Sequence, residues 1–281
     1  MYLRIAGRTD AGRVRKRNED AFLAMTLDDG ASSSSPRWTG RLDVGPRGAL
    51  VAVSDGMGGA QAGDVASGLV LSSLAEALTG PSQAKTSHAT IAGAVKEAHR
   101  SVWQEGCSRG VEMGATLTAA FVRGTHAYVA EVGDSRAYLL RGGSITQLTK
   151  DQSYVQMLVD RGAVSAEDAQ DLPFRNIILQ AMGYQRTLSV DLGRIDLCRR
   201  DCLILCSDGL SNDVKADEMR DVILRSGSLI EAADRLIALA NERGGRDNET
   251  IVLVGVGGDL PPANRGEPVH QVYRVLETFD A

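Results

Sequence analysis

One stretch near the start of the chain constrains the fold more than any other, because a short apolar run ends abruptly at an aspartate and several glycines. The run Leu50–Val53 leads into Asp55-Gly56 and then into a loop that contains Gly58 and Gly59. An apolar run bounded by glycine is typical of a buried strand. Asp55 therefore lies where this strand ends, and a carboxylate among residues with almost no side chain suits a cation or a phosphate that approaches the backbone closely.

The glycine-rich loop departs from both common nucleotide-binding motifs. A dinucleotide fingerprint requires a third glycine at the position of Gln61, and a P-loop requires a lysine after Gly63, where Asp64 stands. An ordinary strand-to-helix turn with Asp55 as a helix cap stays open at this point. Taken alone, the stretch fits a helix cap as well as a metal site, so the rest of the chain must decide between them.

Length and charge exclude several classes of protein. A chain of 281 residues is long enough to bury a substantial core, as one large domain or two small ones. Lys and Arg number 31 against 36 Asp and Glu, and the formal net charge of -5 argues against nucleic acid as a partner, because a phosphate-backbone binder usually presents a net basic face. The hydrophobic fraction of 43% is ordinary for a globular protein, so wholesale disorder is not expected.

The apolar segments and the cysteines predict a cytoplasmic protein that does not enter a membrane. The first residues contain no apolar core of a signal peptide, and no apolar run approaches the roughly 20 residues that span a bilayer. The chain has 4 cysteines, which are Cys107, Cys198, Cys202 and Cys206. They form no CxxC pair, and Leu203–Leu205 between the last two has the pattern of a buried strand, so we expect buried reduced thiols rather than a zinc cluster.

Hydrophobic periodicity predicts the helices and strands. Apolar positions recur at helical spacing in three segments, residues 66–77, 91–102 and 229–240. Successive strands separated by turn signals predict an antiparallel meander at residues 113–122, 126–132, 136–140 and 144–148. Further short strands are expected at residues 3–7, 20–25, 187–195, 201–206 and 249–256.

Three segments interrupt this pattern. Residues 28–48 are polar and rich in serine and glycine, which predicts a mobile surface loop. Residues 151–183 combine short helical pieces with exposed polar residues, which predicts an excursion from the sheet that acts as a lid. Residues 259–281 open with two prolines, and we expect a loosely attached tail. A single domain is therefore predicted to span residues 1–258.

Four aspartates share one local setting. Asp55 and Asp208 each follow an apolar strand within a Ser-Asp-Gly triplet, Asp134 lies between two strands, and Asp247 stands just before a strand. Aspartate is common at turns, so one or two such positions need no explanation. Four carboxylates that abut core strands predict a common focus in the folded protein. Because such charges repel strongly in a low dielectric, the cluster needs cations.

The chemistry of these ligands predicts the metal. All are oxygen donors, with no cysteine or histidine partner, and this donor set selects Mg²⁺ or Mn²⁺ over zinc. Two such ions roughly 4 Å apart, bridged by a carboxylate, would hold a water as hydroxide and aim it at phosphorus. A guanidinium can clamp the negative charge that grows on the phosphoester oxygens, and Arg15 and Arg17 are the candidates.

A set of six motifs identifies a family. Between about Arg8 and Val256 the chain contains, in this order, RTDAGRVRKRNEDA, SDGMGGAQAGDVAS, MGATLTAA, GDSRAYLLRGG, LCSDGLSNDV and RDNETIVLV. No single motif is specific, but together they closely resemble the bacterial PP2C-type (PPM family) metal-dependent serine/threonine protein phosphatases. The resemblance implies an α+β fold of four layers, α-β-β-α, in which two antiparallel sheets are flanked by helices. It also implies that residues 151–183 form the flap beside the active site, which influences substrate choice.

The resemblance implies metal-binding roles for particular residues. Asp55 is similar to the aspartate that bridges both catalytic metals, with the Gly56 carbonyl as a further ligand. Asp208 and Asp247 resemble the remaining protein ligands of the first metal. Asp134 is similar to the aspartate that, together with Asp208, binds a third metal in bacterial members.

Other residues of the motifs surround these ligands. Glu19 and Asp20 match the acidic pair that holds metal-bound waters, and Arg15 matches the arginine that binds the substrate phosphate. Arg17 has no counterpart in the family and is expected to be a surface charge. Met57 stands where eukaryotic members carry a histidine proposed as the general acid, so that acid stays unassigned, although bacterial members commonly share this methionine.

The implied function is hydrolysis of phosphoserine and phosphothreonine in proteins, with two catalytic Mn²⁺ or Mg²⁺ ions and a third ion. The partners implied are a bacterial Ser/Thr kinase and its substrates, and such kinases include regulators of cell-wall growth, sporulation and type VI secretion. The alternative is a non-catalytic phosphoprotein-binding module on the same fold, which would normally lack a metal ligand. A serine hydrolase built on Ser135 is disfavoured, because Ala137 replaces the second glycine of a nucleophile elbow.

Overall fold

The computed structural model describes residues 1–28, 30, 32, 33, 35–58, 62–80, 88–165, 167–172, 174, 176–263 and 274–280. Parts of four predicted segments lie outside this set. They are Gly59 and Gln61 of the glycine-rich loop, residues 29, 31 and 34 of the serine-rich segment, residues 166, 173 and 175 of the flap, and residues 264–273 and 281 of the tail.

The described strands form two antiparallel sheets. The first sheet has the order β10 (Ser144–Gln147), β9 (Arg136–Arg141), β12 (Cys202–Cys206), β13 (Glu249–Gly257), β1 (Tyr2–Asp10) and β4 (Arg37–Asp43). The second sheet has the order β14 (Arg274–Asp280), β11 (Ser189–Asp196), β8 (His126–Val132), β7 (Leu117–Arg123), β5 (Ala49–Gly58), β2 (Asp20–Thr26) and β3 (Ser32–Ser33), and β6 (Met113–Ala115) pairs with the end of β5.

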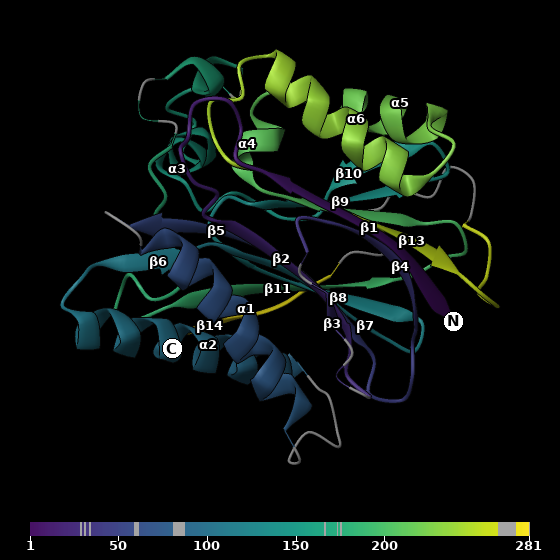
Figure 1. Ribbon diagram of the computed structural model, residues 1–281, viewed down its shortest axis with the longest axis horizontal. Coiled ribbons are helices and arrows are strands. Elements are labelled where there is room, and N and C mark those ends of the chain that lie inside the picture. Colours follow the sequence, from purple (N-terminus) through teal and green to yellow (C-terminus); the bar gives the residue numbers. More distant parts are fainter. Residues whose placement is uncertain are drawn as a thin grey trace.

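Helices cover the outer face of each sheet. The second sheet packs against α1 (Gly63–Thr79) and α2 (His88–Arg109), and the first sheet packs against α4 (Asp208–Ser211), α5 (Ala216–Arg225) and α6 (Leu229–Glu242). Figure 1 shows α1 and α2 on one side of the paired sheets, with α5 and α6 on the other. The predicted four-layer α-β-β-α architecture is therefore confirmed. The flap carries α3 (Tyr154–Asp160) and the 3-10 helix Asp168–Asp171.

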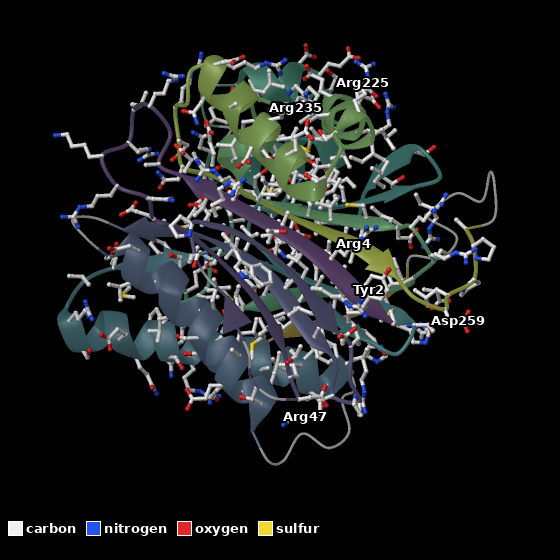
Figure 2. The ribbon with its side chains drawn as sticks, turned by 45° about the vertical axis from the view of Figure 1, so that its right-hand side comes forward. Tyr2, Arg4, Arg47, Arg225, Arg235 and Asp259 are labelled. Carbon is white, nitrogen blue, oxygen red and sulfur yellow. The ribbon has the colours of Figure 1, made fainter. Side chains whose placement is uncertain are left out.

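Charged side chains lie on the outside of these layers. Figure 2 shows Arg225 and Arg235 on the outer helices of the first sheet, and both are exposed with i,i+4 carboxylate partners. Within the part of the chain that the structure describes, no helix is both long and apolar enough to cross a bilayer. All four cysteines are free; Cys202 and Cys206 are buried in β12 as expected, whereas Cys198 is half-buried and Cys107 is exposed.

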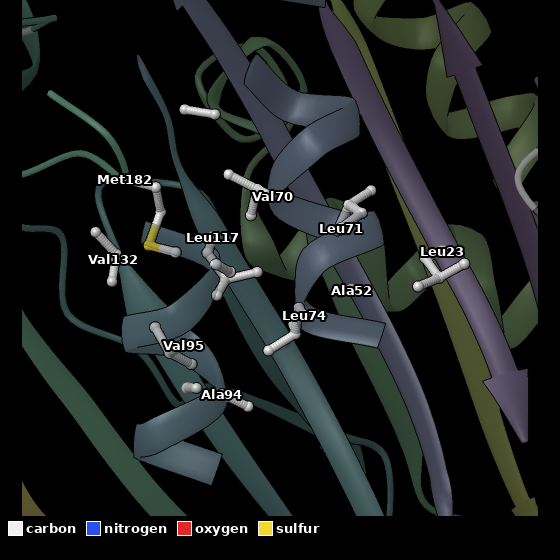
Figure 3. Close-up of a cluster of buried hydrophobic side chains, with 14 of the residues drawn as sticks. Leu23, Ala52, Val70, Leu71, Leu74, Ala94, Val95, Leu117, Val132 and Met182 are labelled. Carbon is white, nitrogen blue, oxygen red and sulfur yellow. The ribbon is translucent and has the colours of Figure 1, made fainter. Parts of the chain in front are cut away.

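Three apolar clusters hold the layers together. One lies between α1, α2 and the second sheet, and Figure 3 shows Val70 and Leu74 of α1 facing Leu117 and Met182 across it. A second fills the space between the two sheets, and a third lies between the first sheet and α6.

β5 illustrates why its sequence is a continuous apolar run. Leu50 and Ala52 point to the helices, whereas Val51 and Val53 point to the other sheet, and each is at most 1% exposed. A strand that is buried on both faces has no polar side, so it cannot alternate as a half-exposed strand does. The prediction of a buried strand before Asp55 is confirmed.

The predicted meander is wrong at one point. β7 and β8 belong to the second sheet, whereas β9 and β10 belong to the first, so the chain changes sheets at Gly133-Asp134-Ser135. Gly133 has a φ of 106°, and a Cβ at this position would lie 2.7 Å from Thr116 Cγ2, so the crossing requires glycine. Hydrophobic periodicity predicts that a strand exists but not which sheet it joins. The crossing between the sheets places Asp134 between the end of β8 and the start of β9.

Two further expectations are corrected. Residues 28–48 were expected to be a loop, but β4 pairs antiparallel with β1 along residues 37–43. Its sequence is polar because it is an edge strand in which exposed residues alternate with half-buried ones. The tail was expected to be loosely attached, but its residues 274–280 form β14 and pair with β11 at the edge of the second sheet.

Candidate metal centre

Two aspartates lie side by side on neighbouring strands. Asp55 is near the end of β5, Asp20 is the first residue of β2, and the two are direct cross-strand partners. Side chains of directly paired residues project on the same side of a sheet, so two carboxyl groups meet here. Thr116 fixes the backbone of Asp55, because its Oγ1 accepts from the Asp55 N–H at 2.9 Å and its N–H donates to the Asp55 carbonyl at 2.8 Å.

Three connections bring further aspartates to the same end of the sheets. Asp134 lies in the crossing from β8 to β9, Asp208 begins α4 after β12, and Asp247 immediately precedes the short turn into β13. Because β12 and β13 pair antiparallel, the end of one adjoins the start of the other. A Cβ on Gly209 would lie 2.1 Å from the Asn248 carbonyl oxygen, so glycine allows the turns that carry Asp208 and Asp247 to pack together. We call Asp20, Asp55, Asp134, Asp208 and Asp247 the aspartate cluster.

Asp20 is held by groups from the other sheet. Ser207 Oγ and Thr250 Oγ1 each donate to Asp20 Oδ2 at 2.7 Å, across 187 and 230 positions in the sequence. The other oxygen, Oδ1, is buried and has no hydrogen-bond partner. A buried oxygen without a partner is costly unless a ligand supplies one. Sequence reasoning missed Ser207 and Thr250, although both lie inside the motifs LCSDGLSNDV and RDNETIVLV.

The electrostatics of the cluster centre on Asp55. Burial, and then the charges of Asp20, Asp208, Asp134 and Asp247, raise the pKa of Asp55 well above its ordinary value. Asp20 and Asp208 are thus the two carboxyl groups whose charges act most strongly on Asp55. The ionised form of Asp55 is therefore disfavoured until a positive charge lies among these groups.

The neighbouring carboxyl groups are shifted in the same direction. Burial raises the pKa of Asp20 to about 7. Burial and then the charge of Asp208 raise the pKa of Asp134 well above its ordinary value, and burial followed by the charge of Asp247 raises the pKa of Asp208. Carboxylates that repel one another in this way are stabilised by a cation among them.

The residues present fit a hard divalent cation. The donors are carboxyl oxygens, one of them buried without a partner, and their mutual repulsion calls for positive charge. Among the described residues, no three His, Cys, Asp or Glu side chains already stand at ligand positions around one point.

Arg15 lies on the loop between β1 and β2, beside the cluster. Its Nη2 donates to Asp247 Oδ2 at 2.7 Å, and about half of its side chain is exposed. The loop is held in place by the Arg13 N–H, which donates to the Gly245 carbonyl at 2.7 Å. Gly12, at a φ of 73°, would carry a Cβ 2.2 Å from the Asp247 carbonyl oxygen, so the loop lies directly on the turn that holds Asp247.

Glu19 stands between this loop and the first turn of α1. The Glu19 carbonyl accepts from Gly56 N–H at 3.1 Å and from Ser67 Oγ at 2.6 Å, and a Cβ on Gly63 would lie 2.7 Å from Glu19 Cδ. Burial and then the charge of Asp64 raise its pKa. The carboxyl group of Glu19 therefore lies beside the cluster and the first turn of α1 in a setting that disfavours its ionised form.

Gly56 must be glycine because three segments meet at its Cα. A Cβ there would lie 2.0 Å from the Gly63 carbonyl oxygen and 2.6 Å from the Glu19 carbonyl oxygen. Met57 follows on β5 and is half-exposed, lining a surface cavity with residues of the flap. The structure therefore offers no acid at Met57, and the general acid stays unassigned.

Arg136 and Asp151 form a partly buried ion pair that the sequence did not reveal as part of the site. Arg136 donates from Nε and Nη2 to the two Asp151 oxygens at 2.8 and 2.6 Å. Both residues line a cavity of about 320 Å³ together with Asp134 and Asp208. The guanidinium thus supplies one fixed positive charge beside the cluster. A larger cavity of about 770 Å³ lies between β2 and α1 and is lined by none of the five clustered aspartates.

Comparison with known proteins identifies the family. A profile of the protein phosphatase 2C family matches residues 38–244. The serine/threonine phosphatase stp of Listeria welshimeri is 37% identical over 252 residues, covering 88% of this chain and 93% of that protein. The serine/threonine protein phosphatase PstP of Mycobacterium tuberculosis is 39% identical over 263 residues, which cover 91% of this chain and 45% of that protein. The chain therefore belongs to the protein phosphatase 2C family.

Solved structures agree with this assignment. The crystal structure of the M. tuberculosis phosphatase PstP/Ppp is similar with a TM-score of 0.78 and 34% identity, covering 92% of this chain and 100% of that chain. A structure of the Streptococcus agalactiae serine/threonine phosphatase also has a TM-score of 0.78, with 30% identity over 91% of this chain. The protein is a serine/threonine protein phosphatase of the bacterial PPM type.

Proposed function

We propose that this phosphatase hydrolyses phosphoserine and phosphothreonine in proteins by a metal-dependent reaction, with divalent cations held in the aspartate cluster. The observation that carries the proposal is the convergence of five buried or half-buried aspartates. Burial is the largest cause that raises the pKa of Asp55, and the charges of the other four aspartates raise it further. A related PstP catalytic domain, 32% identical and with a TM-score of 0.73, was solved in complex with two manganese ions. We therefore propose Mn²⁺ or Mg²⁺ as the ions here.

The proposed ligands are those that the resemblance to the family implies, and their side chains belong to the aspartate cluster or lie beside it. Asp55 and the Gly56 carbonyl would help to hold two cations, and Asp208 and Asp247 would complete the protein ligands of the first. Glu19 and Asp20 would hold ordered waters around the ions, a role that fits the partnerless Oδ1 of Asp20. Asp134, whose pKa is raised by burial and then by the charge of Asp208, would share a third ion with Asp208. When bound, such ions supply positive charge for the phosphate and lower the pKa of water.

Arg15 would bind the phosphate of the substrate. In the structure the Arg15 guanidinium donates a charge-assisted hydrogen bond to Asp247, so it already lies at the edge of the cluster. The phosphate would accept this hydrogen bond in place of Asp247. A phosphate dianion offers the bidentate acceptor geometry that guanidinium prefers, and two oxygens of the phosphate would replace Asp247. The surrounding loop is held by backbone hydrogen bonds to Gly245, which keeps the arginine beside the site.

The substrates proposed are proteins phosphorylated by a bacterial Ser/Thr kinase in the cytoplasm. A related structure is that of PppA, a regulatory component of the type VI secretion system in Pseudomonas aeruginosa, with 32% identity and a TM-score of 0.71. Regulators of type VI secretion are therefore one class of substrate to test. Purified protein should remove phosphate from the autophosphorylated kinase of the same organism, and failure to do so would contradict this pairing.

Metal removal tests the proposed function directly. We expect hydrolysis of p-nitrophenyl phosphate and of a phosphothreonine peptide to require Mn²⁺ or Mg²⁺, to stop with EDTA and to return when metal is restored. The reason is that the carboxylates of the buried cluster repel one another, and only cations among them supply the positive charge that phosphate and water need. Hydrolysis that continues in EDTA would contradict the proposal. Metal binding without any turnover would instead favour a phosphoprotein-binding module.

The two arginines of the loop are expected to differ. Arg15→Ala should lower kcat/KM for a phosphothreonine peptide about 10²-fold, since it removes a donor aimed at the phosphate, and Arg15→Lys should restore little because lysine cannot form the bidentate contact. Arg17→Ala, the matched control from the same exposed loop, should change kcat/KM by about threefold or less. A larger loss from Arg17→Ala than from Arg15→Ala would contradict the assignment.

A further inference from the structure

An apolar groove opens beside the metal centre. One cavity of about 400 Å³ is lined by Met57, Leu179 and Tyr184, and a second of about 260 Å³ is lined by Trp103, Val111 and again Tyr184. Tyr184 and Glu112 line both cavities, so the two form one continuous depression between β6, the end of α2 and the returning end of the flap. We call it the flap groove.

The groove gathers apolar side chains that remain exposed to water. Among the described residues the exposed large apolar side chains are Val14, Val111, Ile177, Leu179, Tyr184 and Leu224. Three of these line the flap groove, and Ile177 lies two positions before Leu179. Exposed apolar side chains that gather in one concave place mark an interaction site, whereas isolated ones are ordinary.

The groove is continuous with the phosphate site. Asp55 and Gly56 lead directly into Met57, which lines the groove. β6 pairs with this end of β5, and its last residue, Ala115, exchanges hydrogen bonds with Met182 at 3.1 and 2.8 Å. A protein substrate whose phosphate lies at Asp55 therefore has its flanking residues beside the groove.

The wall of the groove is fixed before any substrate binds. Gly183 donates its N–H to His99 Nδ1 on α2 at 3.0 Å, and a Cβ at Gly183 would lie 2.1 Å from Val102 Cγ1. The backbone that carries Tyr184 is thus packed tightly against α2. A site that is already ordered loses less conformational entropy on binding, so its apolar contacts contribute more to affinity.

From these observations we infer that the flap groove binds an aromatic or aliphatic side chain of the phosphoprotein substrate, close in sequence to the phosphorylated residue. The exposed carboxylate of Glu112 lines both cavities and favours a lysine or arginine next to that apolar residue over an aspartate or glutamate. The inference rests on the proposed function and specifies which phosphoproteins the site prefers.

A peptide scan tests this preference. The probes are phosphothreonine peptides of glycine and serine that carry one phenylalanine at each of four positions on either side, roughly 13 Å of extended chain. We expect phenylalanine at one position or two neighbouring positions to raise kcat/KM about 10-fold over the unsubstituted peptide, the gain expected from burying one large apolar side chain. A lysine next to that phenylalanine should give a higher kcat/KM than a glutamate.

Variants of the groove connect the preference to the structure. Tyr184→Ala and Leu179→Ala should each remove most of the gain in kcat/KM from phenylalanine. The gain is measured as the ratio of kcat/KM for the best peptide to kcat/KM for p-nitrophenyl phosphate, because the latter has no flanking residues. Leu224→Ala on α5 is the matched control, since Leu224 is 57% exposed and Tyr184 is 52% exposed. This control should keep both activities and their ratio. Circular dichroism confirms that each variant is folded.

The outcomes separate this inference from the proposed function. If p-nitrophenyl phosphate is hydrolysed with Mn²⁺ but the scan is flat, the groove does not bind substrate and the proposed function stands. If neither substrate is hydrolysed at any metal concentration, both proposals are overturned. The scan could also be flat while sedimentation experiments show a concentration-dependent dimer that Tyr184→Ala no longer forms. That result would assign the groove to a second copy of the chain and overturn the inference.

Discussion

Replacing Asp55 by asparagine is expected to abolish metal-dependent hydrolysis, with a fall in kcat of about 10³-fold or more. The expected loss is large because Asp55 lies among the four other aspartates of the cluster, and a bound metal supplies several kcal/mol of transition-state stabilisation. The fold should persist, since asparagine has nearly the size of aspartate and removes one of the mutually repelling buried carboxyl groups.

Thermal unfolding distinguishes loss of metal from loss of fold. The wild-type protein should be stabilised by about 2.7 kcal/mol at a Mn²⁺ concentration 100 times its Kd, and Asp55→Asn should show almost none of this stabilisation. Without metal, the wild-type protein is no longer expected to be the more stable of the two. The raised pKa of Asp55 means that the wild-type protein loses stability as the pH rises above the ordinary carboxyl value of 3.8, and Asp55→Asn removes that loss.

Metal-free Asp55→Asn should therefore be at least as stable as metal-free wild type at pH 8. Asp43→Asn is the matched control, because the Asp43 side chain is 74% exposed on the edge strand β4. It should leave kcat and the Mn²⁺-induced shift unchanged. Retained hydrolysis in Asp55→Asn, or a Mn²⁺ shift equal to that of wild type, would contradict the assignment of Asp55.

Replacing Arg141 by methionine is expected to cost about 3–5 kcal/mol in the free energy of unfolding. Arg141 donates to the two Asp201 oxygens at 2.9 and 2.7 Å and to the Asp196 carbonyl at 2.7 Å. The Arg141 and Asp201 side chains are only 6% and 1% exposed. Methionine keeps the apolar volume but leaves the Asp201 carboxylate buried without its counter-charge, and the desolvation of that charge is then uncompensated.

Denaturant unfolding of matched variants tests the cause of this loss. The double variant Arg141→Met with Asp201→Asn carries no charge at either position and keeps an oxygen for the Cys198 N–H, which donates to Asp201 at 2.7 Å. It should be more stable than Arg141→Met alone. Arg225→Ala is the exposed control, because Arg225 is 79% exposed and lies on the outer helices in Figure 2, and it should change stability by less than about 1 kcal/mol. A double variant no more stable than the single one would show that the buried charge is not the cause.

Much of the fold was predictable because burial leaves a local pattern. The apolar run of β5 predicted a strand covered on both faces, and its alternate residues do pack against α1 on one side and the other sheet on the other. The helical spacing at 66–77, 91–102 and 229–240 predicted α1, α2 and α6, each somewhat longer in the structure. The polar edge strand β4 was missed, since half of its residues face water and leave no apolar signal.

The sequence by itself determined the residue types of the site and their positions at the ends of strands. Aspartate beside glycine at Asp55 and Asp208, the pair Glu19-Asp20 and the arginine-rich loop are local features, and their order along the chain was enough to indicate a phosphatase. Their roles as ligands remain predictions.

Only the tertiary structure decided how these residues meet. The sheet change at Gly133 brings Asp134 to the cluster, Ser207 and Thr250 hold Asp20 from the opposite sheet, and the flap returns beside Met57 to form the groove. The physical reason is distance along the chain. Some strand pairs and hydrogen bonds join positions about two hundred residues apart. They produce no periodic pattern in the sequence around either partner, because the two residues become neighbours only when the chain folds.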